Sequence, residues 1–372
     1  MDNRNEKLAH NLIYNSISLS ENENILVEVI GEDGLELANE IIKQAKIIKA
    51  KPYLNIVNYE DLRKFLINAN KEEIIEYGKK DYELMKKMQA YIGISAPTSD
   101  ETLKGVAHEK LELYNKYYTA LVHLEQRVKH TKWCILRYPN EYFARKSNMT
   151  LSEFKDFYYN VCNVDYNKMK IAMEPLKELM NKTDKVHIVA PDTDLTFSIK
   201  GIPAEKYYGM FNIPDGEVAT CPIKNSVNGY ITYNTKTKYN DIIFENIRFD
   251  FVNGKIVKAF AEKNSKELNE ILDTDNGARY IGAFAFGLNP YVNNTMCDTL
   301  FDEKINGSIH LTPGMALAES DNGNRSAIHW DIVKILRKEF GGGEIYFDNI
   351  LIMKDGKFVL EELKELNIEN LK

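Results

Sequence analysis

Two side chains that could do metal chemistry, His329 and Asp331, stand two residues apart inside an otherwise apolar run over residues 326–333. If this run is a β-strand, its alternate side chains share a face, and the imidazole and the carboxylate point into the same space. Burying a carboxylate is costly unless a cation or a hydrogen-bond donor meets it, and a metal ion satisfies both groups at once. The spacing therefore predicts half of a metal site.

The other ligands must come from elsewhere, and the same half of the chain offers Glu217, Glu303 and His310. Each of them also fits an ordinary structural role. A carboxylate after Pro-Asp-Gly is typical of a solvated turn, and a histidine between isoleucine and leucine is typical of a half-buried, hydrogen-bonded side chain. Ligands that are distant in sequence carry no fixed spacing, so the pattern alone leaves both interpretations open.

Composition and charge exclude several classes of protein. The chain has 372 residues, 44% of them hydrophobic and 28% charged, which is ordinary for two globular domains. No window approaches the ~20 apolar residues of a membrane span, and the polar start lacks a secretory signal. The four cysteines show no paired spacing, which favours the cytoplasm. A net charge of -7 without a basic stripe argues against nucleic-acid binding.

The elements that must position these residues divide into two groups. Residues 24–31 and 52–57 read as strands around a helix over 35–48, which is a parallel βαβ unit. Further strands are expected over 90–95 and 133–137. The sequence therefore predicts a doubly wound α/β N-terminal domain with a parallel sheet over residues 1–184, ending in a long helical stretch from Leu151 to Leu179.

From residue 185 the pattern changes to short alternating strands separated by Gly, Asn and Pro turns. Asn253-Gly254 and Asp355-Gly356 are strong hairpin signals. Residues 185–372 should therefore form an α+β, mainly antiparallel domain, and all the candidate ligands fall in it.

Four segments of this second domain, residues 194–201, 213–218, 299–304 with His310, and 326–331, carry a family resemblance. They resemble the thermophilic-type metallo-aminopeptidases typified by aminopeptidase T and aminopeptidase S. The resemblance implies two divalent ions, Zn, Co or Mn, and release of N-terminal residues from short peptides with a free N-terminus. It also implies a homodimer. The positions that match the family's ligands are Glu217, Glu303, His310, His329 and Asp331.

Two positions depart from the family pattern. Ala283 stands where the family has a metal-binding glutamate, and Leu317 stands where it has a tyrosine that assists the reaction. Loss of the carboxylate weakens the binding of at least one ion, and leucine neither donates a hydrogen bond nor transfers a proton. The sequence therefore predicts a metallo-aminopeptidase with an impaired bimetallic site that holds two ions, one or none. The alternatives are an inactive homologue that binds peptides or forms oligomers, and a changed hydrolysis at one metal.

Overall fold

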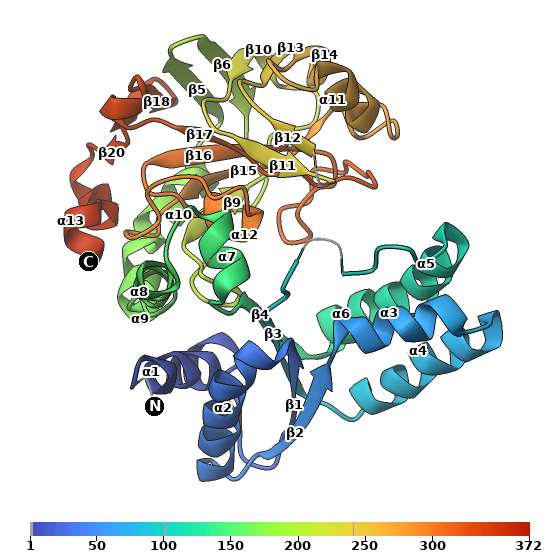
Figure 1. The fold of residues 1–372 in the computed structure, drawn as a ribbon. Helices are drawn as coiled ribbons and strands as arrows, with labels where there is room; N and C mark the ends of the chain where they lie inside the picture. The colour runs from blue at the N-terminus through green and yellow to red at the C-terminus, as the bar shows by residue number, and fades with distance from the viewer. Residues whose placement is uncertain (1–2, 100–101, 241) are drawn as a thin grey trace. The chain divides into compact units, whose positions relative to one another are not determined.

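The computed structural model describes residues 3–99, 102–240 and 242–372, and the chain forms two compact units (Figure 1). The first comprises Met1–Asn163 and Gly209–Ile213, and the second comprises Val164–Tyr208 and Pro214–Lys372. The first unit thus ends earlier than the boundary expected after Asp184. The reason is that the helices following residue 163 pack against one another and against strands and a helical turn of the second unit.

A five-stranded parallel sheet forms the centre of the first unit, in the order β2-β1-β3-β4-β8. Its strands are β1 (Asn24–Ile30), β2 (Lys51–Val57), β3 (Ala90–Ser95), β4 (Lys132–Arg137) and β8 (Phe211–Ile213). The five central residues of β1 are all buried, as expected for a parallel strand covered on both faces, whereas β2 at the edge is largely exposed. This confirms the predicted parallel α/β domain.

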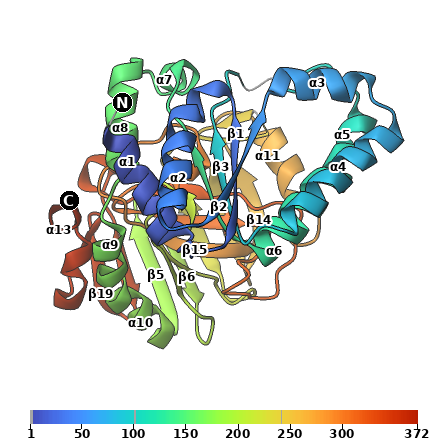
Figure 2. The same cartoon turned by 90° about the horizontal axis from the view of Figure 1, so that it is seen from below.

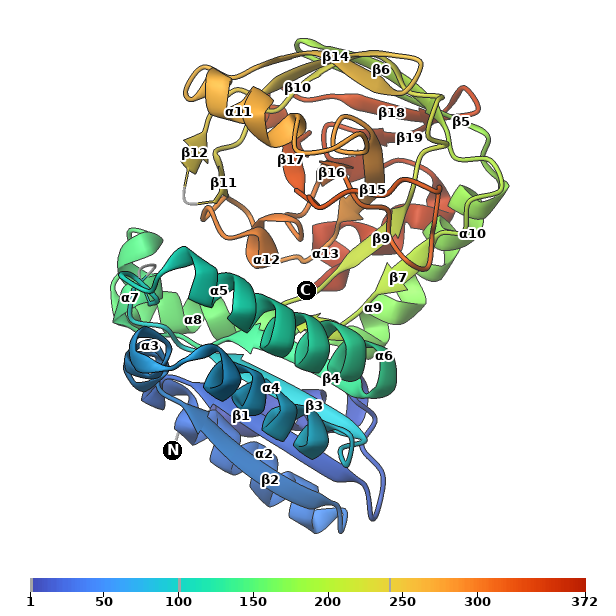
Figure 3. The same cartoon turned by 90° about the vertical axis from the view of Figure 1, so that its right-hand side faces the viewer.

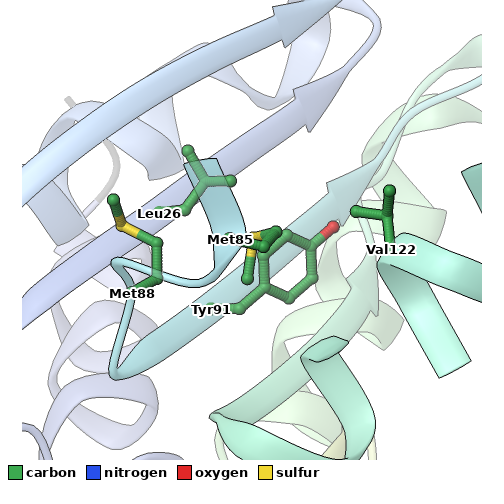
Figure 4. Packing of buried hydrophobic residues seen from close by; sticks show 5 residues of the cluster. All are labelled: Leu26, Met85, Met88, Tyr91 and Val122. Atoms are coloured by element: carbon green, nitrogen blue, oxygen red, sulfur yellow. The ribbon is translucent and has the colours of Figure 1, made fainter. Parts of the chain in front are cut away.

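Helices cover both faces of this sheet, with α1 and α2 on one side and α3 to α6 on the other (Figures 2 and 3). Their bounds are α1 Asn3–His10, α2 Leu35–Ile47, α3 Tyr59–Asn68, α4 Lys71–Met85, α5 His108–Tyr114, α6 Val128–His130, α7 Glu141–Lys146 and α8 Leu151–Cys162, with π-helical η1 Asn11–Ser16 and η3 Asn115–Arg127 and the 3-10 turn η2 Glu32–Gly34. Met85 and Val122 from the helical layer pack with Leu26, Met88 and Tyr91 (Figure 4). No described helix is both long and apolar enough to cross a membrane.

The second unit contains three antiparallel sheets, in the orders β14-β13-β10-β6-β5-β18-β19-β20, β17-β16-β15-β9-β7 and β11-β12. The strands are β5 Lys185–Ala190, β6 Thr193–Ser198, β7 Glu205–Tyr207, β9 Glu217–Thr220, β10 Asn228–Thr232, β11 Thr237–Tyr239, β12 Ile242–Phe244, β13 Arg248–Val252, β14 Lys255–Phe260, β15 Ile281–Gly287, β16 Ser308–Pro313, β17 Ile332–Ile335, β18 Glu344–Phe347, β19 Ile350–Lys354 and β20 Lys357–Phe358. The helical segments are α9 Tyr166–Ala172, α10 Glu174–Lys182, α11 Ser265–Leu272, α12 Thr299–Asp302, η4 Lys338–Phe340, η5 Glu361–Leu366 and α13 Ile368–Leu371. The predicted antiparallel domain is confirmed.

Both hairpin signals are confirmed as turns. Asn253 and Gly254 connect β13 to β14, and Asp355 and Gly356 connect β19 to β20, each residue with a positive φ. Such φ values are what a two-residue turn of this kind needs.

Two local expectations differ from the structure. The stretch expected as one helix from Leu151 to Leu179 is three helices, α8, α9 and α10, because Asp165 caps α9 and a proline begins α10. The strand expected over 326–333 begins only at Ile332, so that His329 forms an isolated bridge with Gly314 instead of lying in a ladder.

Candidate active site

The central strand of the five-stranded antiparallel sheet has an aromatic face and a small-residue face. Phe284 and Phe286 of β15 point toward the eight-stranded sheet, where they meet Phe197 and Phe347 at ring distances of 5.0 and 6.1 Å. The alternate residues are small, and the register aligns Ala285 with His310 of β16 and with Ala219 of β9. Since side chains alternate along a strand, the polar groups of neighbouring strands gather on the face away from the aromatic core.

Three of the predicted ligands meet on this face. His310 Nε2 lies 3.4 Å from a carboxylate oxygen of Glu217 and 3.7 Å from one of Asp331. Glu217 begins β9, His310 lies inside β16, and Asp331 directly precedes β17, which pairs with β16. Strand pairing therefore brings together residues separated by about a third of the chain.

His329 also approaches Asp331, with 3.5 Å between its Nε2 and the carboxylate, although neither residue lies in a strand. The imidazole is oriented by its Nδ1, which lies 2.9 Å from the carbonyl oxygen of Met315. The side chain of His329 is 37% exposed, whereas that of His310 is 4% exposed. The predicted pair is thus adjacent in space, with one imidazole open to solvent.

Glu303 lies close to the same residues, and a lysine that was not predicted as a site residue lies between them. The ammonium of Lys304, which is 1% exposed, hydrogen-bonds Glu217 and lies 2.7 Å from Glu303 and 3.4 Å from Asp215. Both residues of this Glu-Lys pair follow α12 directly. In sequence they read as a solvated charged turn, so no local signal identifies Lys304.

The two carboxyl groups of Glu303 and Asp331 have opposite electrostatic environments. Burial raises the pKa of Glu303, and the charges of Glu217 and Asp331 raise it further, against the effect of Lys304. Burial also disfavours the charged form of Asp331, but His329, His310 and a hydrogen bond from Thr312 lower its pKa to about 2. The pKa of Glu303 is thus raised while that of Asp331 is lowered.

Lys304 stays charged in spite of its burial. Desolvation alone would lower its pKa, but Glu217, Glu303 and Asp215 together raise the pKa well above its ordinary value. The ammonium is therefore a permanent positive charge inside the site.

The two positions that depart from the family pattern lie beside the site. Ala283 is 1% exposed and pairs with Thr312, on the same face as His310. The backbone N–H of Leu317 donates to the carbonyl of Gly282, which holds this loop against β15. Gly282 has no space for a side chain, since a Cβ there would lie 2.1 Å from the carbonyl oxygen of Met315.

A tyrosine also borders the site, on β7. Tyr207 pairs with Glu217 across the β7–β9 ladder, so the two side chains share a face. Burial raises the pKa of Tyr207, and Glu319 and Glu217 raise it further. The phenol therefore stays protonated and can act as a hydrogen-bond donor.

The donor types on this face suit a divalent ion, but the described side chains do not gather into a ready metal site. Imidazoles and carboxylates suit Zn, Co or Mn, and donors bound ~2.0–2.1 Å from a tetrahedral ion lie roughly 3.3–3.4 Å apart, close to the spacings around His310 and Asp331. The buried Nδ1 of His310 also finds no hydrogen-bond partner among the described residues. Nevertheless, no three His, Cys, Asp or Glu side chains in the described ranges stand ready to hold an ion together.

The comparisons with known proteins agree with this architecture. The family described as thermophilic metalloprotease (M29) matches residues 1–358. Aminopeptidase PepS of Streptococcus thermophilus is 26% identical and is aligned over 88% of this chain and 91% of its own length. Aminopeptidase AmpS of Bacillus subtilis is 27% identical over 68% of each chain.

A solved structure has the same fold. Wild-type AmpT from Thermus thermophilus superposes with a TM-score of 0.78 at 19% identity, over 96% of this chain and 99% of that one. The family match extends over both units and includes every segment that contributes to the site. The chain therefore belongs to the thermophilic metalloprotease (M29) family of peptidases.

Proposed function

We propose that this protein is a metal-dependent aminopeptidase that removes the N-terminal residue from short peptides, with slow turnover. The observation that carries the proposal is the meeting of Glu217, His310 and Asp331 on one largely buried sheet face. The names of the relatives, which are aminopeptidases, support the same activity. We further propose a homodimer, as the family resemblance implies, and a cytoplasmic location, as the unpaired cysteines favour.

The predicted ligands are Glu217, Glu303, His310, His329 and Asp331, and we propose that Glu217, His310, His329 and Asp331 would hold a divalent ion. When bound, such an ion polarises the peptide carbonyl and lowers the pKa of a water molecule. Asp331 lies beside both imidazoles and has a lowered pKa, so that it offers an ionised oxygen donor next to them.

Glu303 is the residue that we propose to carry the proton. A buried carboxyl group with a raised pKa can pass a proton between the attacking water and the leaving amine. Two carboxyl groups whose pKa values are pushed apart are the usual arrangement of acid and base in a hydrolase. We therefore move Glu303 from the set of ligands to the role of proton carrier.

Slow turnover follows from the two family positions. Ala283 supplies no carboxylate, and Leu317 supplies no hydrogen bond to the oxyanion that develops during hydrolysis. Loss of one such hydrogen bond costs roughly 10²–10³ in kcat. Tyr207 lies on the same face as Glu217 and offers a protonated phenol that could replace part of this donor.

The test is release of free amino acids from di- and tripeptides by protein loaded in turn with Zn, Co and Mn. The same peptides with an acetylated N-terminus are the control, because only an aminopeptidase requires the free amine. Release from free peptides, lost in Glu303→Gln with metal content unchanged, is the expected result. Saturable peptide binding without release under any metal would refute the proposal and favour the inactive homologue.

A further inference from the structure

The loop that carries His329 and Asp331 into the candidate active site has no regular structure of its own. It spans residues 314–331 between β16 and β17, all of which the structure describes, and contains no helix or strand. So long a loop keeps one conformation only where its polar groups are bonded to the rest of the unit. The contacts that fix the loop therefore decide where His329 lies.

Two asparagines fix the middle of this loop. Asn322 donates from its side-chain amide to two backbone carbonyls outside the loop, at 2.7 and 2.9 Å. Asn324 is fully buried and donates to a carbonyl outside the loop and to one at the loop's beginning, at 2.9 and 2.5 Å. Both asparagines precede residue 326, so the end of the loop that bears His329 needs an anchor of its own.

Asp275 provides this anchor from the turn between α11 and β15. Its Oδ2 accepts the backbone N–H of Ala327 at 2.6 Å and the hydroxyl of Ser326 at 3.0 Å. Its Oδ1 accepts the N–H groups of Gly277 and Ala278 in its own turn, at 2.8 and 3.0 Å. One carboxylate thus ties the turn to the last part of the loop.

The turn lies close against the loop because residue 277 is a glycine. A Cβ at Gly277 would lie 1.9 Å from the carbonyl oxygen of Arg325, a distance that no side chain tolerates. The N–H of Ala327 and the other donors around Asp275 lower the pKa of its carboxyl group. The carboxylate is therefore ionised at neutral pH, and hydrogen bonds to an ionised acceptor are stronger than those between neutral groups.

The effect of this anchor reaches the imidazole in two steps. The carbonyl of Ile328, directly after Ala327, accepts the N–H of Met315 at 2.7 Å. The carbonyl of Met315 in turn lies 2.9 Å from Nδ1 of His329. A shift of residues 326 and 327 would therefore move both the backbone before His329 and the group that orients its ring.

We propose that Asp275 is a positioning residue of the candidate active site, which fixes His329 by holding Ser326 and Ala327. Asp275 acts through the loop, because both of its oxygens are occupied by backbone and hydroxyl donors. The inference rests on the proposed function for the role of His329 in the reaction.

The experiment measures how fast diethyl pyrocarbonate modifies each histidine of the full-length protein, with peptide mapping by mass spectrometry. In Asp275→Asn an NH₂ group replaces one of the two acceptor oxygens, whichever way the amide turns. Loss of one hydrogen bond to a charged group favours the released loop about tenfold, so His329 should react about tenfold faster than in wild type. His310, whose side chain is 4% exposed, should keep its rate.

Asp273→Asn is the matched control. Asp273 lies in the same turn, but its carboxylate accepts from Nε of Arg279 at 2.7 Å, so its loss should leave the rate at His329 unchanged. Equal rates at His329 in Asp275→Asn and Asp273→Asn would overturn the inference. Parallel acceleration at His310 would overturn it as well, because it would indicate general loosening of the unit.

A milder variant covers the case in which Asp275→Asn does not fold. Ser326→Ala removes the hydroxyl that joins Asp275 to the N–H of Ile328, and it should accelerate modification of His329 by a smaller factor. An unchanged rate would count against the inference.

Release of amino acids from peptides separates this inference from the proposed function. Faster modification of His329 in Asp275→Asn, without release by the wild type, would overturn the proposed function alone. Release by the wild type, with an unchanged rate at His329 in Asp275→Asn, would overturn the positioning role alone.

Discussion

Asp331 offers the sharpest test of the site, because one isosteric change, Asp331→Asn, removes its charge and keeps its shape. The carboxyl group has an ordinary pKa of 3.8 and a folded pKa of about 2. A tenfold change in an equilibrium corresponds to ~1.4 kcal/mol, so the ionised group contributes about 2 kcal/mol to the free energy of unfolding at neutral pH. Because the folded pKa is the lower one, this contribution is complete above pH 3.8 and is lost as the pH falls through about 2.

Bound metal should enlarge the difference in stability between wild type and Asp331→Asn. An ion present at 100 times its Kd adds ~2.7 kcal/mol to the stability of the wild type. If the variant binds it about 100-fold more weakly, the same concentration adds only ~0.4 kcal/mol. The difference between wild type and Asp331→Asn should therefore grow from about 2 kcal/mol in chelator to about 4–5 kcal/mol in metal.

The positions of the two tryptophans allow the unfolding of the second unit to be followed by itself. Trp330 is buried beside Asp331, and Trp133 lies in the first unit, so a Trp133→Phe background leaves Trp330 as the fluorescent reporter of guanidinium unfolding. Asp321→Asn is the matched control, because Asp321 also has a pKa of about 2 but pairs with Arg325 on the surface. Equal stabilisation by metal in Asp331→Asn and wild type would refute the assignment of Asp331 as a ligand.

Three further predictions follow from other residues of the second unit. Burial lowers the pKa of Lys334 to about 8 from 10.5, so the folded state binds fewer protons than the unfolded state in this interval. The free energy of unfolding should then rise by about 3 kcal/mol between pH 8 and 10.5. In Lys334→Met, the free energy of unfolding measured by denaturation over the same pH range should show no such rise. Tyr207→Phe should lower kcat about tenfold with unchanged metal content if the phenol donates to the oxyanion; an unchanged kcat would remove it from the mechanism. The double variant Ala283→Glu, Leu317→Tyr should release amino acids faster than wild type, and turnover no faster than wild type would contradict the interpretation of these positions.

Local pattern was sufficient for much of the fold. The run of apolar residues in β1, the helical spacing of α2 and the Asn253-Gly254 turn are all features of short windows, and the structure has each of them at or within two residues of the expected bounds. The prediction of one long helix was wrong for a local reason too, because Asp165 and a proline each favour the start of a new helix over continuation of the previous one.

The arrangement of the candidate active site could be predicted only in part from local sequence patterns. The approach of His329 to Asp331 was predicted from strand alternation, yet it arises from a loop that bridges Gly314 before β17 begins. Lys304 had no signal at all, because its partners Asp215 and Glu217 reach it only when β9 pairs beside β15. Burial of a charge is set by what distant strands bring to it, and a turn sequence such as Asp-Glu-Lys is identical whether it faces water or carboxylates.

The same reasoning connects the substitution at Ala283 with the cation at Lys304. A buried site can hold only as many positive charges as its carboxylates compensate, because each uncompensated charge in a dry interior is expensive. Here Glu217, Glu303 and Asp215 already surround one ammonium, and Ala283 adds nothing to that count. Absence of a carboxylate at position 283 lowers the number of positive charges that this face can compensate. We therefore expect Ala283 and Lys304 together to weaken the binding of divalent ions at this face, in keeping with the slow turnover that we propose.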